Sequence, residues 1–125
     1  KAHRHRKAMG GGMRQAGMLA AAGLFALKNH VERLQTDHVH ATKLYEVIAD
    51  LPFSQEAFVP ETNLVLFRLK EGIADGDFLE KLREKGILAG TMGPGLVRFV
   101  THLDIEESDM EILLNTLKSS ANDLV

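Results

Sequence analysis

The apolar residues after position 30 change from a helical to a strand spacing, and this change limits the folds open to the chain. They first recur every three or four residues, in a stripe that comprises Val31, Leu34, His38, Ala41, Leu44, Tyr45, Ile48 and Leu51. Asn29 is a suitable N-cap for this predicted helix, and Pro52 is expected to mark its end. Thr62–Leu69, with the apolar residues Leu64–Phe67 at its centre, is then predicted to be a buried strand. The pattern predicts a long helix that packs against a sheet.

Two further strands and a helix are predicted after this first strand. Asp75–Lys85 has the apolar spacing of a helix, with Gly86 as its C-terminal cap. Ile87–Ala89 and Val97–Thr101 are predicted strands, and the sequence Gly93-Pro94-Gly95 between them is a strong turn signal.

A terminal helix completes the predicted domain. Ser108 and Glu111 have the spacing of a capping box, and the apolar face that follows comprises Ile112, Leu113, Leu117 and Ala121. The element order predicts an α/β domain with a small three-stranded sheet covered by helices.

Basic residues and glycines dominate the start of the chain, where Gly10-Gly11-Gly12 is surrounded by Arg4, Arg6, Lys7 and Arg14. Backbone N–H groups of a glycine-rich bend, together with the start of a following helix, can bind an anion such as phosphate or carboxylate. The alternative is a flexible turn beside a solvated basic surface. The spacing matches neither a Walker loop nor a dinucleotide fingerprint.

The next segment, from Met13 to Leu27, is predicted to be a tightly packed helix of small and apolar residues. Gly17 and Gly23 each cost such a helix about 1 kcal/mol relative to alanine. We therefore expect close packing or a subunit contact to offset this cost.

Composition narrows the classes of partner. A net charge of −2 gives no general reason to expect nucleic acid or a membrane, and Ala16–Leu27 is too short to span one. The chain contains no cysteine, which excludes disulfides and thiolate metal sites and fits a reducing, cytoplasmic location. The pairs His3/His5 and His38/His40 are two residues apart, whereas helical zinc pairs are usually four apart, so no metal is expected. Instead, His38 is predicted to be packed in its helix and His102 to end a strand.

Arg98 is a charged residue inside an apolar strand. Alternation places it on the face opposite Val97, Phe99 and Thr101. A guanidinium held on a rigid strand is a good bidentate receptor for a carboxylate. The alternative is an edge-strand arginine that is solvated or paired with one of the chain's own acids.

Several segments together resemble the low-specificity L-threonine aldolases, which are pyridoxal-phosphate lyases of the β-eliminating family. Arg6–Gly17 is similar to the segment that follows the cofactor lysine in that family. Met92–Gly95 and Arg98–Asp104 resemble its C-terminal substrate-binding strand, and Pro60–Asn63 resembles part of its small domain. The resemblance covers essentially the whole chain.

This resemblance implies the type I pyridoxal-phosphate fold. Residues 1–29 would be the tail of the large cofactor-binding domain, and residues 30–125 the C-terminal small domain with its linking helix. The implied reaction is the retro-aldol cleavage of L-threonine or L-allo-threonine to glycine and acetaldehyde, in a homodimer or homotetramer.

The resemblance also assigns roles to individual residues. Arg98 matches the arginine that holds the substrate α-carboxylate, while Lys7 and Arg14 match basic residues near the cofactor phosphate or the facing subunit. The Schiff-base lysine is expected upstream of Arg4, so we expect a fragment that contains no catalytic residue and is inactive alone. His5 and Leu96 depart from the family pattern, which often has an aromatic and a basic residue there.

Three alternatives remain open from the sequence. One is a β-eliminating lyase of the same fold with a different amino-acid substrate. Another is a small α/β module that binds phosphate or nucleic acid through its basic N-terminus. A third is a structural, dimerising piece, suggested by the alanine- and glycine-rich helix.

Overall fold

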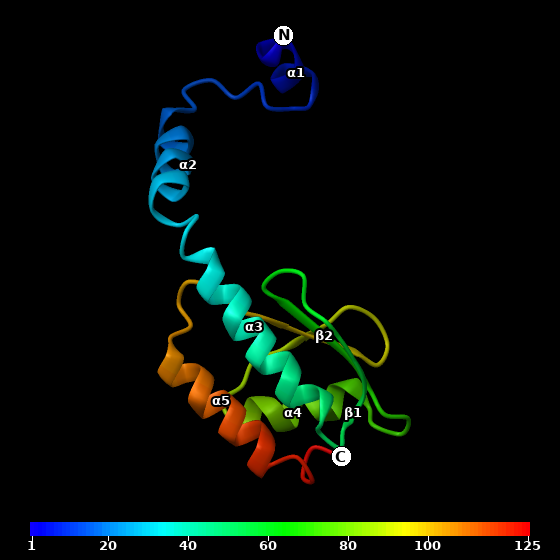
Figure 1. The fold of residues 1–125 in the computed structure, drawn as a ribbon. Helices are drawn as coiled ribbons and strands as arrows, with labels where there is room; N and C mark the ends of the chain where they lie inside the picture. The colour runs from blue at the N-terminus through cyan, green and yellow to red at the C-terminus, as the bar shows by residue number, and fades with distance from the viewer. The chain divides into compact units, whose positions relative to one another are not determined.

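The computed structural model describes all 125 residues, which form two compact units, residues 1–34 and 35–125. The elements are α1 (Ala2–Ala8), α2 (Gly17–Asn29), α3 (Leu34–Ala49), β1 (Ser54–Phe58), β2 (Leu64–Leu69), α4 (Asp75–Glu84), β3 (Gly90–Thr91), β4 (Leu96–Val100) and α5 (Glu107–Ser119) (Figure 1). The first unit holds α1 and α2, and the second holds the sheet with its helices. The α/β class predicted from the pattern is confirmed.

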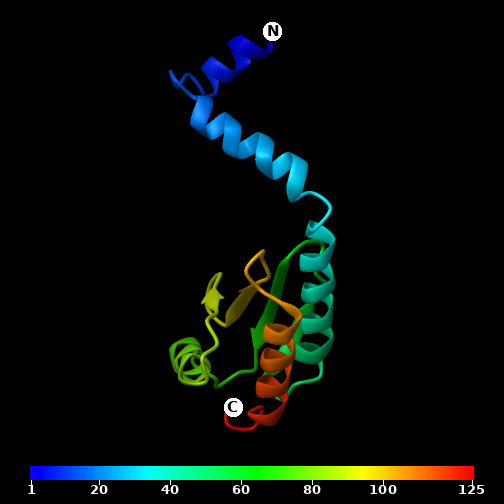
Figure 2. The same cartoon turned by 90° about the vertical axis from the view of Figure 1, so that its left-hand side faces the viewer.

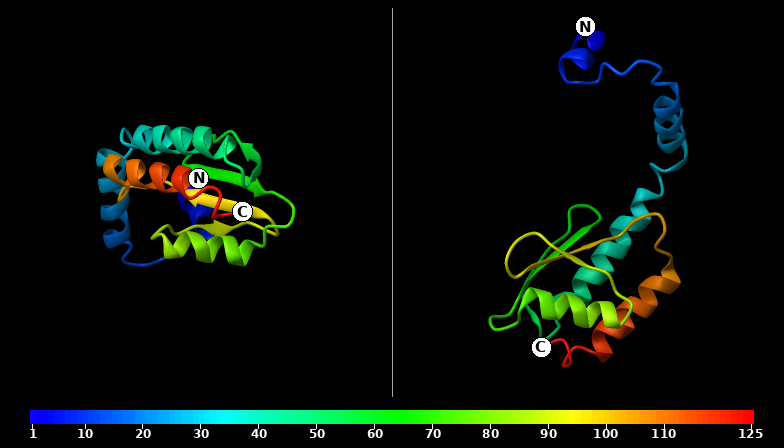
Figure 3. Two further views of the ribbon diagram at one scale, coloured as in Figure 1. Left: turned by 90° about the horizontal axis from the view of Figure 1, so that it is seen from below. Right: turned by 180° about the vertical axis from the view of Figure 1, so that it is seen from behind.

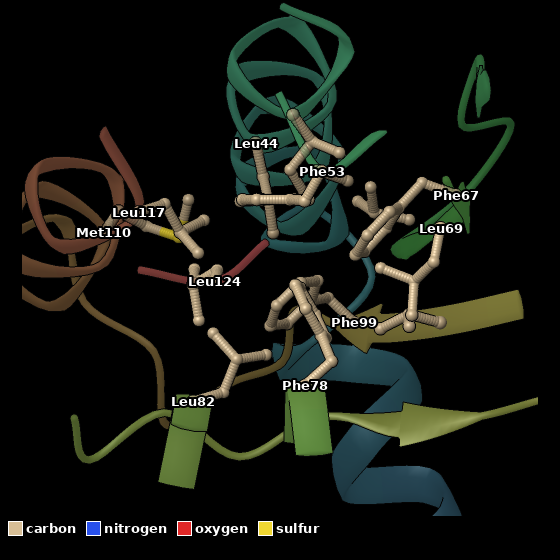
Figure 4. Packing of buried hydrophobic residues seen from close by; sticks show 14 residues of the cluster. Leu44, Phe53, Phe67, Leu69, Phe78, Leu82, Phe99, Met110, Leu117 and Leu124 are labelled. Atoms are coloured by element: carbon tan, nitrogen blue, oxygen red, sulfur yellow. The ribbon is translucent and has the colours of Figure 1, made fainter. Parts of the chain in front are cut away.

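The four strands form one antiparallel sheet in the order β1-β2-β4-β3. Helices α3 and α5 lie side by side, and α4 lies on the opposite side of the core from α3 (Figures 2 and 3). All three helices send buried side chains to the face of the sheet that carries Val65, Phe67, Val97 and Phe99 (Figure 4). The helices of this unit therefore cover one face of the sheet.

Phenylalanines form the centre of this core. The rings of Phe53 and Phe78 have centroids 5.0 Å apart in an edge-to-face contact, and Phe67 stacks on Phe99 at 6.0 Å. Three of these side chains have no exposed surface, and Phe99 has very little. Because burial of such a side chain is worth about 1.5–3 kcal/mol, this cluster is a main source of the domain's stability.

The predicted three-stranded sheet is wrong in strand number, because β1 adds a fourth strand at the edge. The sequence Ser54–Phe58 is mostly polar and lacks apolar alternation, so its pattern gives no strand signal. It pairs only with β2, and its register shifts between Ser54 and Glu56. An edge strand needs fewer apolar residues than an interior one, since fewer of its side chains contact the core.

The predicted strand Ile87–Ala89 is also wrong, because β3 begins only at Gly90. Gly86 has a φ of +78°, and the N–H groups of Gly86 and Ile87 donate to the carbonyls of Arg83 and Leu82. These bonds form the Schellman cap that ends α4, which confirms the predicted role of Gly86. Because Ile87 still belongs to this cap, the strand starts later than its apolar pattern indicates.

The boundary between α2 and α3 differs from the prediction that Asn29 is an N-cap. Asn29 is the last residue of α2, and its side-chain amide donates to the carbonyl of Phe25. This side chain therefore does not cap the next helix, which begins at Leu34.

Helix α5 also begins earlier than predicted, because Glu106 and Asp109 form the capping box in place of Ser108 and Glu111. Its buried residues are Met110 and Leu117, whereas Ile112, predicted on the apolar face, is 66% exposed.

The helices of the first unit bury no side chain. Helix α1 was not predicted, because its sequence is dense in basic residues and has no apolar stripe. A Cβ added at Gly17 or Gly23 would meet no atom within 4 Å, so the first unit does not itself supply the close packing expected around α2. The proposed subunit contact stays a prediction. No helix has the length and apolar character needed to cross a membrane.

A polar cluster joins α3 to α5. Glu107 accepts hydrogen bonds from Lys43 and from His40 Nε2, the latter at 3.0 Å. The hydrogen bond from Lys43, followed by that from His40, lowers the pKa of the Glu107 carboxyl below its usual value. His40 is the buried histidine of this helix, whereas His38, predicted to be packed there, is half-buried.

We predict that Phe78→Ala destabilises this chain by about 3–5 kcal/mol, because it removes a ring from the centre of the core and leaves a cavity. Denaturant unfolding followed by circular dichroism measures the loss. Phe58→Ala is the matched control: Phe58 is 37% exposed on the other face of the sheet, so its removal should cost clearly less. Equal losses for the two variants would contradict the packing described here.

We predict that Glu107→Gln lowers the thermal midpoint of this chain at pH 7. A carboxyl whose pKa is lowered by folding stabilises the fold above its unfolded pKa, and this contribution is lost as the pH falls through the folded pKa. The difference between the wild type and the variant should therefore narrow at acid pH. Glu111→Gln, an exposed change on the same helix, is the control and should show no such pH-dependent difference.

Candidate functional site

The face of the sheet opposite the core carries a half-buried arginine, Arg98, beside apolar side chains. Arg98 lies on β4, directly across from Leu66 on β2 and from Gly90 on β3. β4 is an interior strand, so Arg98 is not an edge-strand residue. The predicted alternation is confirmed, since Val97 and Phe99 are buried in the core while Arg98 is half-buried on the other face.

The guanidinium of Arg98 forms no ion pair and no hydrogen bond within the chain. Its Nε atom is buried and has no partner. A buried donor without a partner is uncommon, because it forfeits its hydration without gaining a hydrogen bond. The interpretation of Arg98 as an arginine paired with the chain's own acids is therefore excluded. The group keeps all its donors for another acceptor.

A shallow depression of about 300 Å³ surrounds this arginine, lined by Leu88, Ala89, Gly90, Arg98, Val100 and His102. His102 lies just past the end of β4, as predicted, and its Nδ1 accepts the backbone N–H of Asp104 at 3.3 Å. In a neutral ring that accepts at Nδ1, the proton is on Nε2. The depression thus combines one cation and a histidine with apolar side chains, a composition that suits a small anionic ligand.

Two sets of hydrogen bonds hold β4 in place. At its C-terminal end, Thr101 Oγ1 donates to the carbonyl of Asp37 on α3 at 2.8 Å, and the side-chain amide of Asn63 donates to the carbonyl of Thr101 at 2.6 Å. At its N-terminal end, both carboxylate oxygens of Asp75 accept the N–H of Gly95, at 2.9 and 3.0 Å. Arg98 therefore extends from a backbone that is fixed on both sides.

Sequence reasoning missed these supporting roles. Asp75 was predicted only as the start of a helix, and Thr101 only as a core-facing strand residue. Each contact joins residues 20 or more positions apart, so no local pattern contains it. The only signal in the sequence was that Asp75 and Thr101 are polar residues at the boundary of an apolar helix or strand.

A second cavity of about 390 Å³ lies between β4, the start of α5 and residues 85–88. Its charged side chains already have partners: Lys85 lies 3.7 Å from a carboxylate oxygen of Asp123, and Asp109 caps α5. Most of the remaining lining is apolar, with Phe99 and Met110 from the core. This cavity offers fewer free polar groups to a ligand than the depression at Arg98.

Lys7 and Arg14, predicted to lie near the cofactor, belong to the first unit. Lys7 is in the last turn of α1, Arg14 lies in the loop before α2, and both are exposed and without an ion pair. The anion cradle that the glycines could form loses two of its backbone donors. The N–H groups of Gly10 and Gly11 donate to the carbonyls of Lys7 and Arg6 and form the Schellman cap of α1. Side chains, rather than these backbone groups, remain to bind an anion.

Comparisons with known proteins place the chain among lyases. Residues 1–71 match the family model described as "Beta-eliminating lyase". The chain is 38% identical over 110 residues to the low specificity L-threonine aldolase of Escherichia coli strain K12, covering 88% of this chain and 32% of that protein. It is 32% identical over 123 residues to low-specificity L-threonine aldolase 1 of Arabidopsis thaliana, covering 96% and 34%.

A probable low-specificity L-threonine aldolase of Schizosaccharomyces pombe is 34% identical over 118 residues, which cover 94% of this chain and 29% of that protein. The chain thus spans about one third of the length of these relatives. With more than half of its residues matched by the family model, the chain belongs to the beta-eliminating lyase family.

Proposed function

We propose that this chain is the C-terminal region of a threonine aldolase-like lyase, which cleaves L-threonine or L-allo-threonine to glycine and acetaldehyde with pyridoxal phosphate. The names of its relatives support the reaction class. The observation that carries the proposal is the half-buried guanidinium of Arg98, unpaired on an interior strand and open to a shallow depression.

In this proposal Arg98 binds the α-carboxylate of the amino-acid substrate. The planar guanidinium donates two parallel hydrogen bonds to a carboxylate, which fix the plane of that group as well as its position. Because the strand is held at both ends, the carboxylate orients the rest of the amino acid, including the bond to be broken. Leu88 and Val100 line the same depression and displace water from around the ion pair.

The proposed cofactor supplies, when bound, a conjugated ring that accepts the electrons of the broken bond. The residues of this chain fit its phosphate group, since Lys7 and Arg14 are exposed cations without ion pairs. The lysine that bonds the cofactor is not assigned to this chain. None of its lysines follows the serine and precedes the glycine typical of that site; they are Lys1, Lys7, Lys28, Lys43, Lys70, Lys81, Lys85 and Lys118.

The wider assembly is part of the same proposal. The partners are an amino-acid substrate, the large domain upstream and further copies of the subunit in a homodimer or homotetramer. The absence of cysteine fits a reducing compartment, and we propose the cytoplasm. A different amino-acid substrate is the second candidate, because the matched family model is named for β-elimination and not for threonine cleavage.

We predict that Arg98→Ala in the complete enzyme lowers kcat/KM for L-threonine about 100-fold, because a charged bidentate contact is worth about 3 kcal/mol. Arg98→Lys should recover part of this loss, since it restores the charge but not the fork. Steady-state cleavage of threonine, with glycine release as the readout, measures both. A panel of other amino acids in the same assay tests the second candidate substrate class.

Arg68→Ala is the matched control for Arg98. Arg68 is an exposed arginine of β2 and lies across from Leu96 on the neighbouring strand. Its removal should leave kcat/KM within about twofold, as is usual for a surface change. Threonine cleavage that is unaffected by Arg98→Ala would contradict the carboxylate role.

We predict that Lys7→Ala combined with Arg14→Ala raises the dissociation constant for pyridoxal phosphate about tenfold or more. Each lost charged hydrogen bond costs about 1.5 kcal/mol, and tenfold corresponds to about 1.4 kcal/mol. Absorbance during titration of the apoenzyme gives this constant. Lys28→Ala, an exposed change in α2, is the control. Unchanged cofactor affinity in the double variant would place these two residues outside the phosphate site.

A further inference from the structure

We propose that Gly90 is a specificity-determining residue, because its lack of a side chain gives the substrate carboxylate access to Arg98. The inference rests on the proposed carboxylate role of Arg98 and adds a second residue to that site. Gly90 is the residue of β3 that lies directly across from Arg98 in the antiparallel register. Both residues line the same depression.

The backbone does not require glycine at this position. The glycines with positive φ are Gly10, Gly72, Gly86, Gly93 and Gly95, so Gly90 has a conformation open to other residues. Position 90 lies in a strand, where β-branched and aromatic residues are favoured and glycine weakens the pairing. A conformational reason for glycine is therefore absent.

Packing within the chain does not require glycine either. A Cβ added at Gly90 would meet one group within 4 Å, the Nη2 atom of Arg98, at 3.6 Å. This is an ordinary van der Waals distance, so a methyl group fits without displacing the backbone. No other strand or helix approaches this position closely.

The group that a side chain at position 90 would meet is the guanidinium of Arg98, so glycine leaves space beside this group. Directly paired residues on one face of an antiparallel sheet have Cβ atoms about 4.5–5.5 Å apart, so a longer side chain at position 90 would lie against the guanidinium. Leu66 already occupies the other side of Arg98, on β2. Gly90 therefore leaves one flank of the guanidinium free for a ligand. A glycine of this kind in a strand is typical of a place where a ligand comes close to the backbone.

The test uses Gly90→Ala, Gly90→Val and Gly90→Leu in the complete enzyme loaded with cofactor. Calorimetric titration with glycine measures carboxylate binding without turnover, and steady-state assays give KM and kcat for L-threonine. We expect Gly90→Leu to raise the dissociation constant for glycine and the KM by about tenfold, as for the loss of one charged hydrogen bond. Gly90→Ala should change the dissociation constant and the KM by less than about threefold. Gly90→Val should have an effect between those of Ala and Leu, because its side chain is intermediate in size. Valine also favours strands, so this variant should keep β3 paired.

Thr91→Leu is the matched control, because Thr91 is the other residue of β3 and pairs with Val97 rather than with Arg98. It should leave glycine binding unchanged. Cofactor absorbance and the thermal midpoint of each variant show that the fold is kept. A graded loss of glycine affinity from Ala to Val to Leu, with kcat nearly constant, supports a role of Gly90 in access to Arg98. A general packing defect would instead lower the thermal midpoint, and Thr91→Leu would lose as much glycine affinity as Gly90→Leu.

Glycine affinity in Gly90→Leu equal to that of the wild type, with Arg98→Ala impaired, would overturn the role of Gly90 and leave the proposed function intact. Conversely, glycine binding that depends on Arg98 and is weakened by Gly90→Leu, in an enzyme that does not cleave threonine, would support the role of Gly90. That second outcome would reject the proposed reaction. Glycine binding that is insensitive to Arg98→Ala would overturn both residues' roles.

Discussion

The one-sided packing of the sheet is the constraint on which the rest of this domain depends. Side chains alternate between the two faces along each strand. Because Phe67 and Phe99 are buried under the three helices, their neighbours on each strand, including Arg98, must lie on the opposite face. A shift of register by one residue would bury Arg98 and expose the phenylalanines. The hydrophobic core thus fixes which residue is presented to a ligand, although none of its members contacts the ligand site.

Rigidity follows from where the strand is held. Thr101 is tied to α3 and Gly95 to the start of α4, so the ends of β4 are fixed by elements that are themselves packed in the core. A receptor that is ordered before binding loses less conformational entropy when its ligand arrives. This supports a binding role for an arginine that has given up part of its hydration without forming an internal ion pair.

Local patterns predicted the elements whose signals are local. The alternation around Arg98, the Gly86 cap and the helical spacing of α4 were all readable from a few neighbouring residues. Strand β1 was missed because its polar sequence is a strand only through pairing with β2, and α1 because it buries nothing. The same limit applies to the site. Arg98 is recognisable in its strand, whereas Gly90 gains meaning only when the register places it opposite that arginine.

The proposed phosphate site at Lys7 and Arg14 and the proposed carboxylate site at Arg98 differ in their exposure to water, and this difference can make each site prefer its own ligand. Lys7 and Arg14 are exposed cations, suited to a doubly charged phosphate that retains much of its hydration. Arg98 lies among Leu88, Val100 and the strand backbone, where removing water from an anion costs more as its charge increases. A single half-buried guanidinium can compensate one carboxylate charge but not two. The apolar rim would therefore favour an amino-acid carboxylate over the cofactor phosphate, without any residue that repels phosphate directly.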